Sequence, residues 1–189
     1  MDAKKPSYLG LLSAIALGEG RAHQYLSCWA AKTPDPDVKK VILTVAIREG
    51  EHSHAFTKRL CELGYTVQDR PDPSFEKNMA IANADCSDLE KFEALGYRAD
   101  STPKDPFKGI LDDETLDIQT SELLGRYVAE ERDSGRMLRA CYDVLRERAG
   151  RGRAQAAPWS RELRELHERL DEICAAIGKL QQEVTALRR

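Results

Sequence analysis

Two long stretches of helical apolar periodicity, separated by a Thr-Pro-Asp-Pro break at residues 33–36, constrain the fold of this chain most strongly. Proline lacks the backbone donor that a continuing helix needs, so a first helix must end before this break. Asp35 is a favourable N-cap with a proline at the first helical position behind it, and Gly64 is a favourable stop. The sequence therefore predicts helices over residues 7–32 and 36–63, which form an antiparallel hairpin.

The segments that follow are also predicted to be helical. Residues 74–96 form a weaker helical region, with a break at 85–87 where capping residues cluster. A connection that contains prolines, residues 97–112, leads to a strongly periodic helix over residues 113–149. Helix-favouring residues are abundant and β-branched runs are scarce. We therefore predict an all-α protein whose residues 1–149 form an up-and-down four-helix bundle.

The C-terminal segment has the most regular apolar repeat in the chain. It follows a basic hinge of Gly, Arg and Ala at residues 150–158 and covers residues 159–189. Apolar residues recur there at alternating spacings of three and four, which is a heptad seam. The seam predicts either a coiled coil that makes a homo-oligomer or a fifth helix docked on its own bundle. Its members are Leu163, Leu166, Leu170, Ile173, Ile177, Leu180, Val184 and Leu187.

Composition limits the partners and the compartment. The formal net charge of -3 weighs against nucleic acid as a partner, since such binders usually carry a basic face. The five cysteines are dispersed, with no C-x-x-C pair, as is typical of reduced thiols in the cytoplasm. No apolar run approaches the ~20 residues that cross a bilayer, so no membrane partner is expected. Residues 8–18 have the character of a secretory signal, but their helical pattern continues to Trp29 and belongs to the fold.

Acidic side chains interrupt the apolar stripes of the first two predicted helices near their midpoints. Glu19 interrupts the first stripe, and Glu49 and His52 lie three residues apart within the second. Glu19 is twelve residues before Ala31 and Glu49 is twelve after Asp37, so both lie about 18 Å from the same turn. Facing, buried carboxylates are costly unless they share protons or a cation. A set of Glu and His ligands suits iron or manganese.

The predicted helix over residues 113–149 is also acidic at its midpoint. One alignment with the second helix gives an E-x-x-D pair, Glu130 and Asp133. The competing register takes Glu131 as the ligand and Ser134 as a neighbour. Periodicity alone does not choose between these two registers.

Further candidates lie outside these motifs. Glu93 follows an apolar face in the third predicted helix, although Asp85 and Glu90 stay open as alternatives there. Tyr127 precedes the acidic pair of the later helix by one turn and is positioned to hydrogen-bond a ligand. His23 falls off the best stripe, so we expect it behind the ligands rather than among them.

Glu19, the Glu49-x-x-His52 pair and the later acidic helix together resemble the ferritin-like, rubrerythrin-type di-iron carboxylate proteins. In that family a Glu from each of two helices and a Glu-x-x-His from each of two others surround two metal ions. The resemblance covers residues 7–148. It implies a ferritin-like bundle that binds iron, as one or two ions, or manganese, and that acts on dioxygen or peroxide as an oxidase, ferroxidase or peroxidase.

The resemblance assigns metal ligands to both halves of the bundle. Glu19, Glu49 and His52 hold one side, and Glu130 or Glu131 with Asp133 holds the other. The second His of the family pattern is missing. Since the chain has no C-x-x-C module, redox turnover requires an external electron donor.

Two alternatives remain open at this point. The first is a metal-free helical scaffold that acts through its C-terminal coiled coil. In the second, residues 113–149 form the third bundle helix and the C-terminal segment the fourth, with residues 74–96 as an excursion. That arrangement leaves a site built from three helices only.

Overall fold

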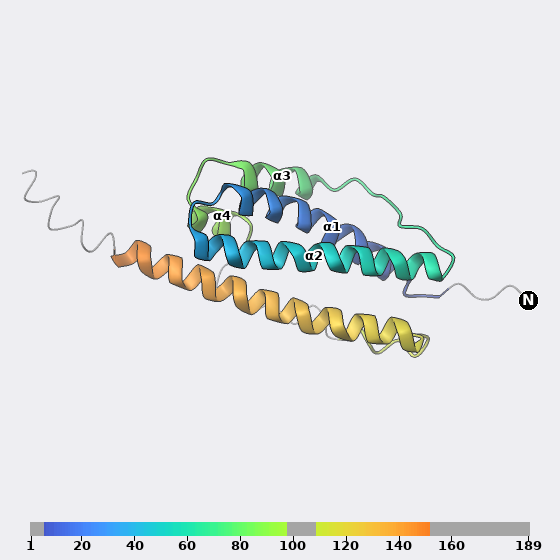
Figure 1. Cartoon of the computed structure of the whole chain (residues 1–189). Helices are drawn as coiled ribbons and strands as arrows, with labels where there is room; N and C mark the ends of the chain where they lie inside the picture. Colours follow the sequence, from blue (N-terminus) through green and yellow to red (C-terminus); the bar gives the residue numbers. More distant parts are fainter. Residues whose placement is uncertain (1–5, 98–108, 152–189) are drawn as a thin grey trace, which may run out of the picture. The chain divides into compact units, whose positions relative to one another are not determined.

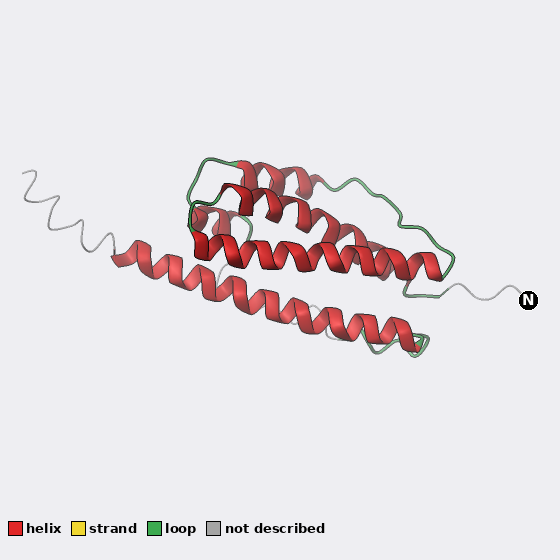
Figure 2. Cartoon of the chain, in the orientation of Figure 1, coloured by secondary structure: helices red, strands yellow, loops and turns green. Residues whose placement is uncertain are grey.

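The computed structural model describes residues 6–97 and 109–151. These residues form five helices and no strand, which confirms the predicted all-α class for this part of the chain (Figure 2). Contacts divide the chain into two compact units, Met1–Leu145 and Arg146–Arg189. The predicted heptad segment, residues 159–189, lies outside the described residues, as does the hinge beyond residue 151.

The first two helices, α1 (Leu9–Lys32) and α2 (Pro36–Glu62), form the predicted hairpin and pack along each other (Figure 1). Asp35 caps α2, because its carboxylate accepts hydrogen bonds from the backbone N–H groups of the next turn. Gly64 follows α2 with a φ of 80°, a left-handed conformation that favours glycine. The hairpin boundaries therefore follow from the local chemistry of the chain.

Two glycines allow α1 and α2 to approach closely near their midpoints. A Cβ atom on Gly20 would lie 2.9 Å from Ser53 Oγ, and one on Gly50 would lie 2.9 Å from His23 Nδ1. The Ser53 hydroxyl donates to a carbonyl of α1 at 2.8 Å, and His23 Nδ1 contacts a carbonyl of α2 at 2.6 Å. Both glycines stand next to a mid-helix acid, so this approach sets the level at which the two acids meet.

The region predicted over residues 74–96 forms two short helices, α3 (Pro73–Asn83) and α4 (Asp88–Ala94). The predicted break between them is confirmed, since Ser87 and Glu90 form a capping box that starts α4. Neither helix extends over the length of α1 or α2. The described residues thus contain three long helices and two short ones, and a four-helix bundle is not confirmed.

The last described helix covers residues 118–151, so its start is five residues later than predicted. Asp117 accepts hydrogen bonds from the backbone of Thr120 at 2.9 Å and from Arg59 of α2 at 2.7 Å. Asp113 instead closes a turn with the N–H group two residues further on. Both aspartates are good caps, but only Asp117 gains the contact with α2.

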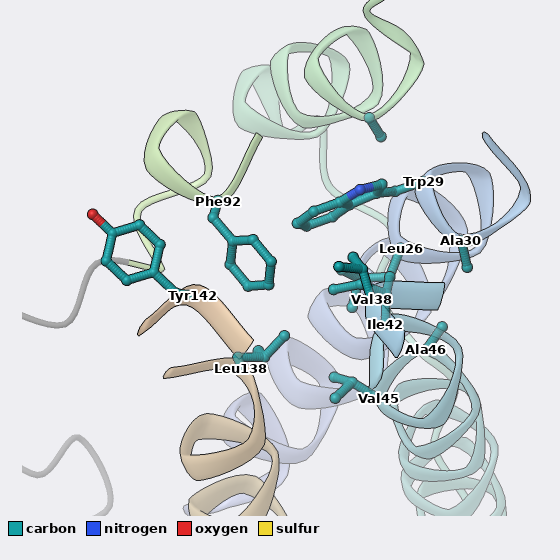
Figure 3. Close-up of a cluster of buried hydrophobic side chains, with 11 residues drawn as sticks. Leu26, Trp29, Ala30, Val38, Ile42, Val45, Ala46, Phe92, Leu138 and Tyr142 are labelled. Carbon is teal, nitrogen blue, oxygen red and sulfur yellow. The ribbon is translucent and has the colours of Figure 1, made fainter. Parts of the chain in front are cut away.

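The apolar side chains form two clusters, one on each side of the mid-helix acids. One joins the N-terminal half of α1 to Phe56 and Leu124, and the other joins the C-terminal half of α1 to Phe92 and Leu138. Figure 3 shows the second cluster, in which the rings of Trp29 and Phe92 meet edge to face with centroids 4.8 Å apart. This order of contacts makes the last helix parallel to α1 and antiparallel to α2.

Candidate metal centre

Four side chains from three helices meet in the polar layer between the two apolar clusters. They are Glu19 of α1, Glu49 and His52 of α2, and Glu131 of the last helix. Each offers one ligand atom, and these atoms all lie within 4.8 Å of one another. Glu19, Glu49 and His52 are buried, and Glu131 is half-buried. The structure therefore brings together the mid-helix acids and the histidine that the sequence singled out.

Three buried atoms of this cluster have no hydrogen-bond partner among the described residues: Glu19 Oε2, His52 Nδ1 and Glu131 Oε1. They face one another, because His52 Nδ1 lies 3.7 Å from Glu19 Oε2 and 3.4 Å from Glu131 Oε1. Buried polar atoms in proteins are nearly always hydrogen-bonded. Three such atoms at one point, each of a type that ligates metals, form a donor set that a cation would satisfy.

The second polar atom of His52 and that of Glu19 are hydrogen-bonded to side chains of the last helix. His52 Nε2 donates to Glu130 Oε2 at 2.8 Å, and the Tyr127 hydroxyl donates to Glu19 Oε1 at 2.8 Å. The Tyr127 ring also meets His52 edge to face, with centroids 5.1 Å apart. A ligating histidine usually donates its second N–H group to a carboxylate in this way. These contacts leave the inner atoms of Glu19 and His52 directed into the cluster.

Burial and crowding shift the proton affinities of the cluster. Burial, together with the neighbouring Glu19 carboxylate, raises the pKa of Glu49 to about 11. Burial opposes charge on His52, but its contacts with Glu131, Glu19 and Glu130 raise the His52 pKa to about 10. Carboxylate and imidazole groups ligate a cation in their deprotonated forms, so proton binding and cation binding compete at this cluster.

A pocket of about 380 Å³ opens beside the cluster and has Glu19, Glu49 and Glu131 in its wall. Tyr25 of α1 and Tyr97, which follows α4, line the same pocket, and their hydroxyl oxygens lie 3.0 Å apart. Burial raises the pKa of both tyrosines, so both hydroxyls keep their protons at neutral pH. A small molecule has a route to the carboxylates through this pocket.

The last helix adopts the register that places Glu131 in the cluster and Ser134 beside it. Ser134 is 2% exposed, and its hydroxyl accepts a hydrogen bond from Arg48 at 3.3 Å. Asp133 is turned away from the cluster and pairs with Arg48 at 2.7 Å. Glu130 lies behind His52 rather than among the four ligand atoms. The structure thus does not bring the E-x-x-D pair into the cluster.

Two further predicted residues also lie outside the cluster. Glu93 is exposed and accepts a hydrogen bond from Tyr142 at 3.3 Å. His23 contacts the carbonyl of Ala46, so it ties α1 to α2 instead of touching the ligands. The alternatives to Glu93 also lie outside the cluster, since Glu90 belongs to the capping box with Ser87 and Asp85 is not among the four grouped side chains. The cluster therefore draws on three helices.

Sequence patterns did not predict Arg48, Tyr25 or Tyr97 as site residues. A basic residue one turn before His52 was a visible signal for Arg48, because such a residue lies beside the ligand stripe of a helix. Tyr97 gives no such signal. It reaches the pocket only because α4 turns the chain back towards α1.

Comparison of the chain with protein-family models, with curated proteins and with solved structures finds no match in any of the three. The resemblance to rubrerythrin-type proteins consequently rests on the residues named above. Among the helices within residues 6–97 and 109–151, none has both the length and the apolar character needed to cross a membrane.

Proposed function

We propose that this chain is a non-haem metal protein that binds iron or manganese between α1, α2 and the last helix. The observation that carries the proposal is the convergence of Glu19 Oε2, His52 Nδ1 and Glu131 Oε1 without hydrogen-bond partners. Leaving one buried polar atom unsatisfied costs about 1–3 kcal/mol. A divalent cation among the three atoms removes this cost for all of them.

The residues have separate roles in this proposal. Glu19, Glu49, His52 and Glu131 ligate the ion, which gives a set of carboxylates with one imidazole. Such a set suits iron or manganese better than zinc, which favours more nitrogen and sulfur ligands. Glu130 orients His52 by accepting its second N–H group.

The resemblance to rubrerythrin-type proteins extends the proposal to a reaction. When bound, the metal supplies redox chemistry towards dioxygen or peroxide. The side chains of the chain bury the ligands, hold their orientation and leave a pocket through which a small molecule can enter. An external electron donor completes the turnover, because the sequence contains no C-x-x-C module.

Metal analysis of the full-length protein tests this proposal. We expect near-stoichiometric iron or manganese in protein purified without chelators or reconstituted without oxygen. Glu49→Gln and His52→Ala should each abolish it, because each removes a ligand. Glu51→Gln is the matched control, since Glu51 is an exposed acid on the same turn of α2.

Two results would contradict the proposal. One is metal content in Glu49→Gln equal to that of the native protein. The other is native protein that binds neither metal after reconstitution. The second result would favour the alternative of a metal-free scaffold acting through its C-terminal heptad segment.

A further inference from the structure

We propose that the candidate centre holds one metal ion per chain, whereas rubrerythrin-type proteins surround a pair of ions. This inference rests on the proposed function, because it concerns the number of ions held by the same side chains. Three observations carry it: the compact ligand set, the residues at the place of a second Glu-x-x-His motif, and the side chains that line the pocket.

The ligand set is compact enough for one coordination sphere. Metal bonds to carboxylate oxygen or imidazole nitrogen are about 2.0–2.2 Å long, so atoms on opposite sides of one ion are roughly 4.0–4.4 Å apart. The four candidate ligand atoms lie within 4.8 Å of one another, close to this span. Two ions at the usual separation of about 3.5–4 Å would spread the outermost ligands over roughly 8 Å.

The last helix does not contain a second Glu-x-x-His motif at the cluster. The family pattern requires an imidazole three residues after the glutamate of the later helix. In this chain the residue three positions after Glu131 is Ser134. Its buried hydroxyl already accepts a hydrogen bond from Arg48. The later helix therefore contributes one ligand, where the family pattern needs two.

The positively charged side chain of Arg48 lies next to Ser134. The Arg48 Nη1 atom lies 2.7 Å from Asp133 Oδ2, 3.3 Å from Ser134 Oγ and 3.8 Å from Met137 Sδ. A guanidinium group carries a positive charge. A second divalent cation next to it would meet electrostatic repulsion and would have to compete with Arg48 for Asp133.

The pocket side of the cluster presents hydroxyls instead of additional carboxylates. Tyr25 and Tyr97 line it, and Glu93 is engaged elsewhere with Tyr142. Among the described residues, the only side chains grouped as potential ligands of one ion are the four already named. Coordination positions that these four leave open face the pocket, where water or a small molecule can occupy them.

The number of ions is measured directly on the full-length protein. Metal-free protein is dialysed against Mn(II) up to saturation, and the bound metal is counted per chain. Electron paramagnetic resonance of the same samples separates an isolated Mn(II) ion from an exchange-coupled pair. The Glu49→Gln variant, treated identically, reports manganese bound loosely to surface carboxylates, and this amount is subtracted.

The inference predicts one specific Mn(II) ion per chain, with the hyperfine pattern of an isolated ion at every loading. Two specific ions with the spectrum of a coupled pair would overturn the single-ion inference and leave the proposed function standing. No specific ion would overturn both. The three outcomes therefore distinguish failure of this inference from failure of the proposed function.

Discussion

Tyr127 shows how one hydroxyl group can orient a buried carboxylate. It donates to Glu19 Oε1 at 2.8 Å, while its ring packs edge to face against His52 and Phe56. The hydrogen bond holds one oxygen of Glu19 outward and directs the other oxygen into the cluster. Tyr127 is therefore a positioning residue in the proposed centre.

We expect Tyr127→Phe to weaken metal binding by roughly 10–100-fold, as is usual when a partner of a metal ligand is removed. The ring packing stays, so the fold should survive with a loss of about 1–3 kcal/mol from the unsatisfied Glu19 oxygen. Competition with a metal-binding dye and urea unfolding measure the two effects. Tyr142→Phe, which removes a hydroxyl outside the site, should leave affinity unchanged. Equal affinities in the native protein and Tyr127→Phe would contradict the assigned role.

At the scale of helices, the close approach of α1 and α2 brings Glu19 and Glu49 together. Gly50→Ala places a methyl group about 2.9 Å from His23 Nδ1, closer than Cβ atoms normally approach another atom. His23 cannot easily retreat, because its ring contacts a carbonyl of α2. We therefore expect Gly50→Ala to separate the helices, to lower the free energy of unfolding and to weaken metal binding.

Gly125→Ala is the matched control, because an added Cβ atom there meets nothing within 4 Å. It should stabilise the last helix by up to about 1 kcal/mol, the usual gain of alanine over glycine in a helix. Urea unfolding with and without Mn(II) measures both variants. If Gly50→Ala gained stability to the same extent as Gly125→Ala, the close approach would not constrain the site.

Asp117, which caps the last helix, should make the stability of the fold depend on pH. Burial alone would raise the pKa of Asp117, but hydrogen bonds from Thr120, Arg59 and Tyr8 lower it well below the ordinary 3.8. A carboxyl group with a lowered pKa stabilises the fold above its unfolded-state pKa and loses that contribution as the pH falls through its folded-state value. The stabilising contribution of Asp117 should therefore be complete near neutral pH, begin to decrease near 3.8 and be lost only as the pH falls through the lower folded-state pKa.

Asp117→Asn keeps the capping oxygen but removes the charge that faces Arg59. We expect a loss of about 1 kcal/mol at neutral pH, a modest value because this ion pair is partly exposed. The acid-induced decrease in stability should become shallower than in the native protein. Urea unfolding across the acid range measures it, with the exposed Asp143→Asn as control. If the free energy of unfolding of Asp117→Asn decreased in acid as steeply as that of the native protein, Asp117 would not be the source of the decrease.

The hairpin and the level of its acids could be predicted because both depend on local rules. Proline and Asp35 set the start of α2, and the constant rise of a helix places Glu19 opposite Glu49. The register of the last helix could not be predicted, because Glu130 and Glu131 share one face. Glu131 joins the cluster and Glu130 contacts His52 from outside it, an arrangement that comes with the pairing of Arg48 and Asp133 between helices distant in sequence.

The predicted helix over residues 74–96 shows again that long-range contacts could not be predicted from the sequence. The cap at Ser87 was visible in the sequence, but its consequence was not: a broken helix places Glu93 away from the cluster and Tyr97 beside the pocket. Asp113 and Asp117 are equally good caps by sequence, and the helix starts behind Asp117, the one of the two that pairs with Arg59 of α2. The candidate site therefore draws on three helices. The other part of the three-helix alternative, the C-terminal segment as a fourth bundle helix, lies outside the described residues and stays a prediction.

For the whole molecule, the heptad segment over residues 159–189 stays a prediction. If it forms a coiled coil between chains, the full-length protein self-associates, and charges placed in the seam by Ile173→Asp and Ile177→Asp dissociate it. Gln182→Glu, at an outer heptad position, should leave the mass unchanged. Analytical ultracentrifugation measures the mass of each variant. A native protein that is monomeric at all concentrations would instead indicate a docked helix.

An anomalous-difference map of crystals of the metal-reconstituted protein, collected at the iron and manganese absorption edges, tests the central claim most directly. The account predicts a single peak among Glu19, Glu49, His52 and Glu131, about 2.0–2.2 Å from their ligand atoms. A map with no peak between these side chains would contradict it.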